Sequence, residues 1–410
     1  MNDSPDLQNW PGAGELRRLW MLDPQWTYLN HGGFGACPRP VLEVQRQWQD
    51  RLESQPINFL ARQAEAELLR ARSELADFVG ADADDLVFVT NATMGVNTVL
   101  RCLSFSPGDE IIIADHAYPA VTNGLRYVTE RSGAKMVNVQ LPWPLGEDAE
   151  QAQEKLVAAF TGKFTTRTRL LVLDHITSPS GIIMPVEKIC AAAREKGIPV
   201  LVDGAHAPGM LKLNLKTLGA TYYTGNCHKW ICSPKGAGFL WVDPRAQENI
   251  VPLSLSLGWM LKNEEESWYQ TLFKYTGTWD PSPELSVPAA LDFFRELPGG
   301  WEEVRRRNHE LLLQARALLC EELNASPPVP AELLGSLATI PLPDGPVAPL
   351  EERLVNEFRI EVPVFGWPFR KREIPGPRLL RLSAQVYNDM DQYAYLASCL
   401  KKCLAASPAD

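Results

Sequence analysis

The feature that most constrains the fold is a regular alternation of short apolar segments with longer segments of helical periodicity. Residues 86–89, 110–114, 135–139, 169–173, 198–202 and 220–225 are expected to be strands. The segments between most of them carry apolar side chains at helical spacing. Strands that alternate with helices predict a mainly parallel sheet with helices on both faces. Residues 236–242 are expected to form a further strand that runs antiparallel, and residues 257–278 are expected to be a loop.

The bulk composition excludes several classes of protein. Of the 410 residues, 45% are hydrophobic and 22% are charged, as in ordinary globular proteins. A net charge of −10 argues against a nucleic-acid partner, which would require a basic face. No apolar run approaches the ~20 residues that span a bilayer, so no membrane partner is expected. The polar N-terminus lacks the pattern of a secretion signal, and we therefore expect a cytoplasmic protein.

Cysteine spacing gives no indication of a metal site. The eight cysteines are too few for a disulfide framework in a chain of this length. No two of them form a CxxC pair, which is the usual spacing of zinc ligands. We therefore expect no metal.

The chain is long enough for one large domain and one smaller domain. Residues 57–286 are expected to form the large domain around the sheet. Residues 287–410 are expected to form a small α+β domain, with short strands between prolines at 336–388 and helices near 301–323 and after 390. Residues 1–56 are expected to be an N-terminal arm and linking helix, with helices near 16–23 and 41–54, which packs with the small domain.

Two polar residues follow neighbouring strands of the predicted sheet. Asp203 ends the apolar segment 198–202, and Lys229 follows the segment 220–225. Ligands bind at such strand ends in open α/β sheets. A buried aspartate needs a cationic partner, and a desolvated lysine becomes a usable amine. A lone lysine is normally a surface residue, but the pair suggests pyridoxal phosphate (PLP), with Asp203 at the pyridine nitrogen and Lys229 at the aldehyde.

Other strand ends carry residues that suit such a cofactor. Ala92 and Thr93 precede a helix from about residue 94, where free N–H groups bind phosphate, although ordinary helix capping has the same pattern. His116 and Tyr118 follow the strand 110–114, and their rings could stack on a planar cofactor. The glycine-rich residues 31–35 are expected to be a loop that either approaches a ligand or makes only a tight turn.

Taken together, these segments resemble PLP enzymes of fold type I, in the class V aminotransferase group that includes cysteine desulfurases. Within that group the chain is most similar to the isopenicillin-N epimerase-like branch. The matching segments are 28–32 (YLNHG), 90–93 (TNAT), 203–209 (DGAHAPG), 225–230 (GNCHKW), 277–282 (GTWDPS) and 381–388 (RLSAQVYN). They extend over nearly the whole chain, and they are more specific for fold and cofactor than for the reaction.

The resemblance implies roles for individual residues. Lys229 would hold the cofactor and carry the Cα proton, Asp203 would pair with the pyridine nitrogen, and His206 would donate to the ring hydroxyl. The phosphate would be bound by residues from several segments: Ala92, Thr93, Asn226, His228 and, from a partner subunit, Thr276 or Thr278. Arg381 would bind the substrate α-carboxylate, with Asn30 and His31 as further substrate-binding candidates. A homodimer follows from the partner's contribution.

Two departures from the group bear on the reaction. Cysteine desulfurases carry a nucleophilic cysteine upstream of the arginine that binds carboxylate, and residues 362–377 contain none. Cys227 lies beside Lys229, where it is expected only to pack. Trp279 stands where the branch often has an arginine, which suggests a different substrate.

The sequence favours chemistry at the α-carbon of an amino acid without fixing its outcome. The resemblance favours epimerisation. The alternatives are a C–S lyase that acts on a cysteine conjugate, as in hercynylcysteine sulfoxide lyases, and a class V aminotransferase. Tyr118 would serve as an acid for the sulfur leaving group in a lyase, or only stack near the ring. A non-catalytic binder would not need Lys229, Asp203 and Arg381 together.

Overall fold

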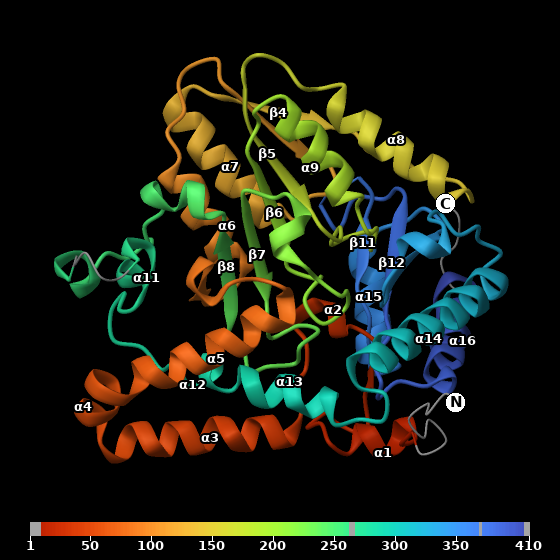
Figure 1. Ribbon diagram of the computed structural model, residues 1–410. Helices are drawn as coiled ribbons and strands as arrows, with labels where there is room; N and C mark the ends of the chain where they lie inside the picture. Colours follow the sequence, from red (N-terminus) through yellow and green to blue (C-terminus); the bar gives the residue numbers. More distant parts are fainter. Residues whose placement is uncertain (1–9, 262–266, 369–370, 406–410) are drawn as a thin grey trace, which may run out of the picture.

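The computed structural model describes residues 10–261, 267–368 and 371–405 (Figure 1). Its central sheet has seven strands in the order β2-β8-β7-β6-β5-β3-β4. The strands are β2 (Leu86–Val89), β3 (Glu110–Ala114), β4 (Lys135–Val139), β5 (Thr168–Asp174), β6 (Val200–Gly204), β7 (Tyr222–Asn226) and β8 (Gly238–Val242). Only β8 runs antiparallel to its neighbours. The predicted mainly parallel α/β fold, including the antiparallel strand, is confirmed.

Helices cover both faces of this sheet because its strands are apolar on both sides. Along β5, Leu171 and Leu173 pack in one core with α5 (Ala64–Val79), α8 (Ala149–Thr161) and α9 (Val186–Glu195). Leu170 and Val172 point the other way, into a core with α6 (Ala92–Cys102) and α7 (Pro119–Ser132). Alternate side chains of a strand face opposite sides, so a strand covered on both faces is a continuous apolar run.

The C-terminal part forms a second, smaller sheet. It contains β9 (Leu337–Leu342), β11 (Val364–Gly366) and β12 (Arg378–Ser383), all antiparallel. Helices α14 (Gly300–Glu322) and α16 (Met390–Ala405) pack against each other on this side of the molecule. In Figure 1, the two helices lie together with β12 at one end of the molecule, away from α7 and α11. None of the described helices is both long enough and apolar enough to cross a membrane.

The N-terminal segment is tied to the C-terminal part. Strand β1 (Thr27–Tyr28) pairs in parallel with β10 (Ile360–Glu361). Helix α3 (Arg39–Ser54) packs against α12 (Ser282–Leu285) and α13 (Val287–Arg295). The division of the chain into domains at residues 56 and 286 stays a prediction.

The other short elements are α4 (Pro56–Asn58), a π-helical turn (Phe59–Gln63), α10 (Leu215–Leu218) and the 3₁₀ turns Ala83–Asp85, Pro244–Asn249, Leu257–Met260 and Ala331–Leu333.

Four segments differ from the sequence prediction. Helix α1 is Ala13–Arg17, because Trp20 already pairs as an extended bridge with Pro38. The expected glycine loop contains a helical turn, α2 (His31–Phe34). The region 257–278, expected to be a loop, contains α11 (Trp268–Phe273), which Ser267 caps. A helix, α15 (Val347–Asn356), lies among the C-terminal strands, since prolines are tolerated in a first helical turn.

The sheet topology brings the carboxyl ends of several strands to one edge. Strands β2, β3, β5, β6 and β7 all point the same way, because β2 and β7 are both antiparallel to the β8 that lies between them. The segments that follow these strands therefore meet at that edge. It also receives the start of β8, which is joined to β7 through residues 227–237.

Candidate active site

A cavity of about 330 Å³ lies at this edge of the sheet. The residues that line it come from the segments after β2, β3, β5, β6 and β7 and from α2. They are Gly33, Phe34, Thr90, Asn91, Ala92, Thr93, Tyr118, Asp174, Ile176, Ser178, Asp203, Ala205, His206, Asn226, His228, Lys229, Lys235 and Gly236. The cavity therefore brings together most of the residues that the sequence singled out.

Lys229 presents its amine to this cavity beside His206. The Lys229 Nζ atom lies 3.2 Å from His206 Nε2, and Trp230 Nε1 donates to His206 Nδ1 at 3.4 Å. With Nδ1 accepting, the proton of a neutral imidazole is on Nε2, which then donates to the amine lone pair. Burial, followed by the charge of Arg381, lowers the pKa of Lys229 to about 7. The amine is thus held as a nucleophile near neutral pH.

Two buried carboxyl groups line the cavity beside Lys229. Asp203 and Asp174 are register partners on the adjacent strands β6 and β5. One Asp203 oxygen accepts from the Ala205 N–H at 3.0 Å. Burial raises the pKa of both carboxyls, and the charge of Asp203 further raises that of Asp174. Sequence reasoning missed Asp174, although it ends an apolar strand in the same way as Asp203.

The turn at the start of α6 is bound to the segment that carries Lys229. Asn91 caps α6 by accepting from the Met94 N–H, while the Ala92 N–H donates to Asn226 Oδ1 at 2.8 Å. Ala92 and Asn226, both expected at the phosphate, thus bond to each other. The Thr93 N–H follows at the helix N-terminus, where anions bind.

His228 also lines the cavity, but its ring is neutral. Its Nδ1 contacts the Ala237 carbonyl oxygen at 3.2 Å. Burial and the neighbouring Lys229 lower the pKa of His228 to about 4. Because Nδ1 then carries the only ring proton, Nε2 of His228 has a lone pair and no hydrogen. Nε2 can therefore donate a hydrogen bond to phosphate only after the ring is protonated.

Arg381 lies beside the cavity and contacts one of its lining residues. Its guanidinium donates to the Ser178 carbonyl oxygen at 2.7 Å and to Asn30 Oδ1 at 3.2 Å. The side chain is buried, and its Nε has no hydrogen-bond partner among the described residues. Burial lowers the pKa of Arg381 to about 10, which leaves it charged at neutral pH. An unpartnered buried guanidinium nitrogen suits a substrate carboxylate.

His31 is placed behind Lys229 and does not line the cavity. Its Nδ1 contacts the Tyr387 hydroxyl at 2.7 Å, and its Nε2 contacts the Lys229 carbonyl oxygen at 3.0 Å. Burial lowers the pKa of His31 to about 3, so the ring is neutral. This position suits support of the Lys229 backbone better than the substrate contact expected from the sequence.

The two rings that follow β3 have different surroundings. Tyr118 lines the cavity and is 44% exposed, whereas His116 is buried and does not line it. The His116 ring contacts Ser180 through Nδ1 at 2.7 Å and packs against Trp367 and Trp143 at 4.4 and 5.5 Å between centroids. The Nε2 of His116 has no hydrogen-bond partner in the described parts of the chain. Stacking of His116 on a cofactor stays a prediction.

The two threonines expected to reach a partner's phosphate lie away from the cavity of their own chain. The Thr278 hydroxyl contacts the Tyr275 hydroxyl at 2.7 Å, and the Thr276 carbonyl oxygen accepts from Ser254. Trp279 packs against Tyr275 at 5.8 Å. Neither threonine lines the cavity, and their contact with the phosphate of a partner subunit stays a prediction.

Comparison with known proteins identifies the family. The profile of the family "Aminotransferase class-V" matches residues 27–363. The chain belongs to the class V aminotransferase family. It is 35% identical to isopenicillin N epimerase of Amycolatopsis lactamdurans, over 93% of this chain and 96% of the relative. It is 30% identical to a probable chloroplastic L-cysteine desulfhydrase of Arabidopsis thaliana, over 92% and 83%.

A solved structure has the same fold as this chain. It is a C-DES mutant with glycine covalently linked to the PLP cofactor, with a TM-score of 0.78 and 22% identity. The alignment covers 94% of this chain and 98% of that chain. PLP is the cofactor of this chain, and the resemblance to class V enzymes inferred from the sequence is confirmed.

The described residues provide a partner for each polar group of PLP. Asp203 is a buried carboxyl group whose second oxygen has no described hydrogen-bond donor, and a pyridinium N–H would supply one. The Lys229 amine would form the covalent link, and the Thr93 turn would receive the phosphate.

Gly35, which directly follows α2, is a position that tolerates no side chain. Its φ is +68°, and an added Cβ would lie 2.0 Å from the His228 carbonyl oxygen. We expect Gly35→Ala to lower the free energy of unfolding by about 2–4 kcal/mol, since both the backbone strain and the clash must be relieved. Denaturant unfolding measures this loss. The matched Gly14→Ala change, with nothing within 4 Å, should be neutral or slightly stabilising, and equal effects would contradict the argument.

The lowered pKa of Lys229 predicts the pH dependence of cofactor capture. An amine attacks an aldehyde only when it is neutral, so the rate at which cofactor-free protein binds PLP covalently should rise with pH through about 7. Stopped-flow absorbance of the visible band measures this rate. A midpoint near ~10, as for an ordinary lysine, would show that the amine is not desolvated.

Proposed function

We propose that this chain is a PLP-dependent epimerase that acts at the α-carbon of an amino acid or amino-acid derivative. The observation that carries the proposal is that the Lys229 amine, with a pKa of about 7, lines one cavity with Asp203, and that Arg381 bonds to Ser178 in the wall of the same cavity. The similarity to isopenicillin N epimerase over nearly the full length supports this reaction.

Each residue has a physical task in this proposal. Bound PLP supplies the electron sink that weakens the Cα–H bond of the substrate. Arg381 orients the substrate carboxylate, since Asn30 and Ser178 hold its guanidinium in place. The neutral Lys229 amine accepts the Cα proton, and His206 holds the amine by its Nε2–H. Epimerisation then requires that a proton be delivered to the opposite face of Cα. Asp203 provides the negative charge that keeps the cofactor nitrogen protonated.

A C–S lyase is the second candidate, and Tyr118 favours it. The Tyr118 side chain lines the cavity and could deliver a proton to a sulfur leaving group. The L-cysteine desulfhydrase relative supports this alternative. Transamination is the third possible outcome at the same α-carbon. The absence of cysteine from residues 362–377 argues against a persulfide-forming desulfurase.

The experiment that separates these reactions is incubation of the holoenzyme with a panel of amino acids and cysteine conjugates in deuterated water. Epimerisation is expected to give racemised substrate with deuterium at Cα. A lyase would give pyruvate and a released thiol, and a transaminase would give a keto acid and pyridoxamine phosphate. Pyruvate with thiol as the only products would reject the epimerase assignment.

We also propose that the chain acts as a cytoplasmic homodimer. A line of large apolar side chains is exposed near Thr276, at Leu255, Leu257, Trp259 and Met260. Contiguous exposed apolar groups of this kind suit burial in an interface. All eight cysteines are free, as expected in a reducing compartment. Sedimentation at micromolar concentration would give the mass of a monomer if the homodimer proposal is wrong.

A further inference from the structure

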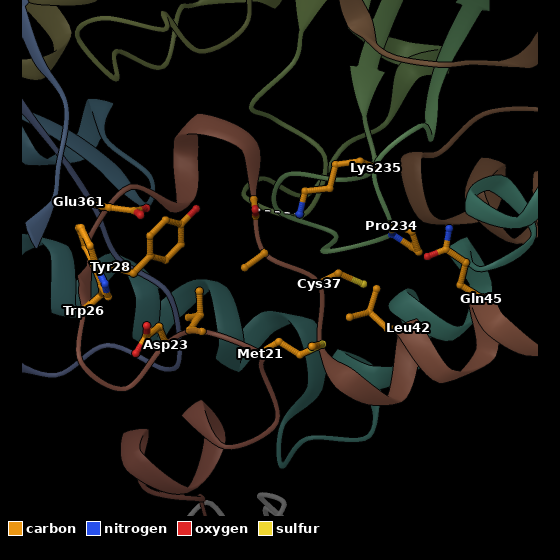
Figure 2. A pocket seen from close by; sticks show the side chains of 13 residues that line it. Met21, Asp23, Trp26, Tyr28, Cys37, Leu42, Gln45, Pro234, Lys235 and Glu361 are labelled. Atoms are coloured by element: carbon orange, nitrogen blue, oxygen red, sulfur yellow. Dashed lines mark hydrogen bonds between the residues drawn. The ribbon is translucent and has the colours of Figure 1, made fainter. Parts of the chain in front are cut away.

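A second and larger cavity lies next to the first. It has a volume of about 620 Å³ and is shown in Figure 2. Lys235 lines both cavities. The end of α2 and the residues that follow it lie between the two cavities: Gly33 and Phe34 line the first cavity, whereas Gly35 and Ala36 line the second. We call the second cavity the outer chamber.

The outer chamber has aromatic rings and carboxylates at one side. Trp26, Tyr28, Asp23 and Glu361 group together there, as Figure 2 shows. Burial, followed by the charge of Glu361, raises the pKa of Tyr28, so this carboxylate acts on the Tyr28 hydroxyl. Among the residues that the structure describes, Glu361 has no lysine, arginine or histidine as an ion-pair partner.

The outer chamber is also connected to the group that would hold the substrate carboxylate. The Tyr28 hydroxyl donates to the Asn30 carbonyl oxygen at 3.1 Å, and Asn30 Oδ1 accepts from Arg381. Asn30 therefore links Tyr28, in the wall of the outer chamber, to Arg381, which would bind the substrate carboxylate. The two cavities meet at Lys235, which lines both.

We propose that the outer chamber binds the distal end of an elongated amino-acid substrate, and that this end carries a cationic nitrogen. The proposal rests on the proposed function, in which Arg381 and Lys229 hold the amino-acid end. A free small amino acid would leave the outer chamber to water. A cation between Glu361 and the faces of Tyr28 and Trp26 gains both charge pairing and cation–π attraction. Lys235, at the junction, disfavours a cation there and favours one placed farther out.

The test is a binding series on the PLP-loaded protein. S-(ω-aminoalkyl)-L-cysteines of increasing chain length are compared with S-alkyl-L-cysteines of equal length, and Kd is measured from the change in visible cofactor absorbance. Beyond a threshold length, the cationic ligand should bind about fivefold to tenfold more tightly than its neutral counterpart. In Glu361→Gln, this preference should fall below about twofold.

The control is Glu352→Gln, which removes one exposed negative charge from α15 outside the outer chamber. It should keep the preference for the cationic ligand. Equal affinities for both ligands at every length would overturn the proposal, as would an undiminished preference in Glu361→Gln. If short amino acids still change the absorbance in that case, the proposed function stands and only the outer-chamber assignment fails. If no amino acid changes it, both fail.

Discussion

Replacing Lys229 with alanine is expected to abolish the visible absorbance band of the protein loaded with PLP and to lower kcat by about 10³-fold or more. The Lys229 amine is the only lysine nitrogen that His206 contacts among the described residues, at 3.2 Å. Its loss removes both the covalent link to the cofactor and the group that moves the Cα proton. Absorbance spectroscopy and steady-state kinetics measure the two losses separately.

Lys196→Ala is the control for this change. Lys196 is exposed at the end of α9 and does not line the cavity, so the variant should keep both the band and the activity. A Lys229→Ala protein that retained the visible band would place the covalent link on another lysine. Lys235, which also lines the cavity, would then be the next residue to replace.

Replacing Asp203 with asparagine is expected to lower kcat/KM by about 10²–10³-fold. The amide keeps the size of the side chain but not its negative charge, so the cofactor nitrogen is no longer held protonated. Steady-state kinetics at saturating PLP measure this loss without a contribution from cofactor release. Asp50→Asn, on the exposed side of α3, should leave kcat/KM unchanged. Equal activity of Asp203→Asn and the wild type would refute the role of the carboxylate.

The same variant has an opposite effect on the stability of the cofactor-free protein. Burial raises the pKa of Asp203 in the folded state. A raised carboxyl pKa contributes stability below the unfolded value of about 3.9, and this contribution is lost as pH rises through the folded value. Asparagine does not titrate, so the Tm of Asp203→Asn relative to the wild type should increase as pH rises from about 3.9 to the folded pKa, and it should stay constant above that value. A charged group that lowers the stability of the fold but is needed for activity is expected at a functional site.

The strands of the parallel sheet were predictable because each is an apolar run bounded by polar residues. The bounds of β2, β3 and β4 match the predicted ones. All residues of β3 are buried, and after Glu110 it is a continuous apolar run, whereas the edge strand β4 is exposed at Lys135 and Asn138. Helix α15 was missed because Pro346 and Pro349 suggested a loop, whereas prolines also begin helices. The turn α2 was missed because two glycines in succession weaken any helical pattern.

The site was predictable where its residues end strands. Asp203 and Lys229 were expected to meet on that ground, and both line the cavity. Asp174 carries the same signal and could have been found by it. The positions of His31 and Lys235 could not be predicted from strand ends, because they depend on contacts between segments about 200 residues apart in sequence.

The pairing of the first and last segments of the chain has a consequence for biosynthesis. Asn30 and His31 meet Arg381 and Tyr387, and His31 holds the Lys229 carbonyl oxygen from behind. Contacts of such long sequence separation form late and slow the folding of a domain. While the chain emerges from the ribosome, the sheet can assemble before residue 381 has been translated. The nascent protein would therefore have its cofactor lysine in place before it has the arginine that selects a substrate.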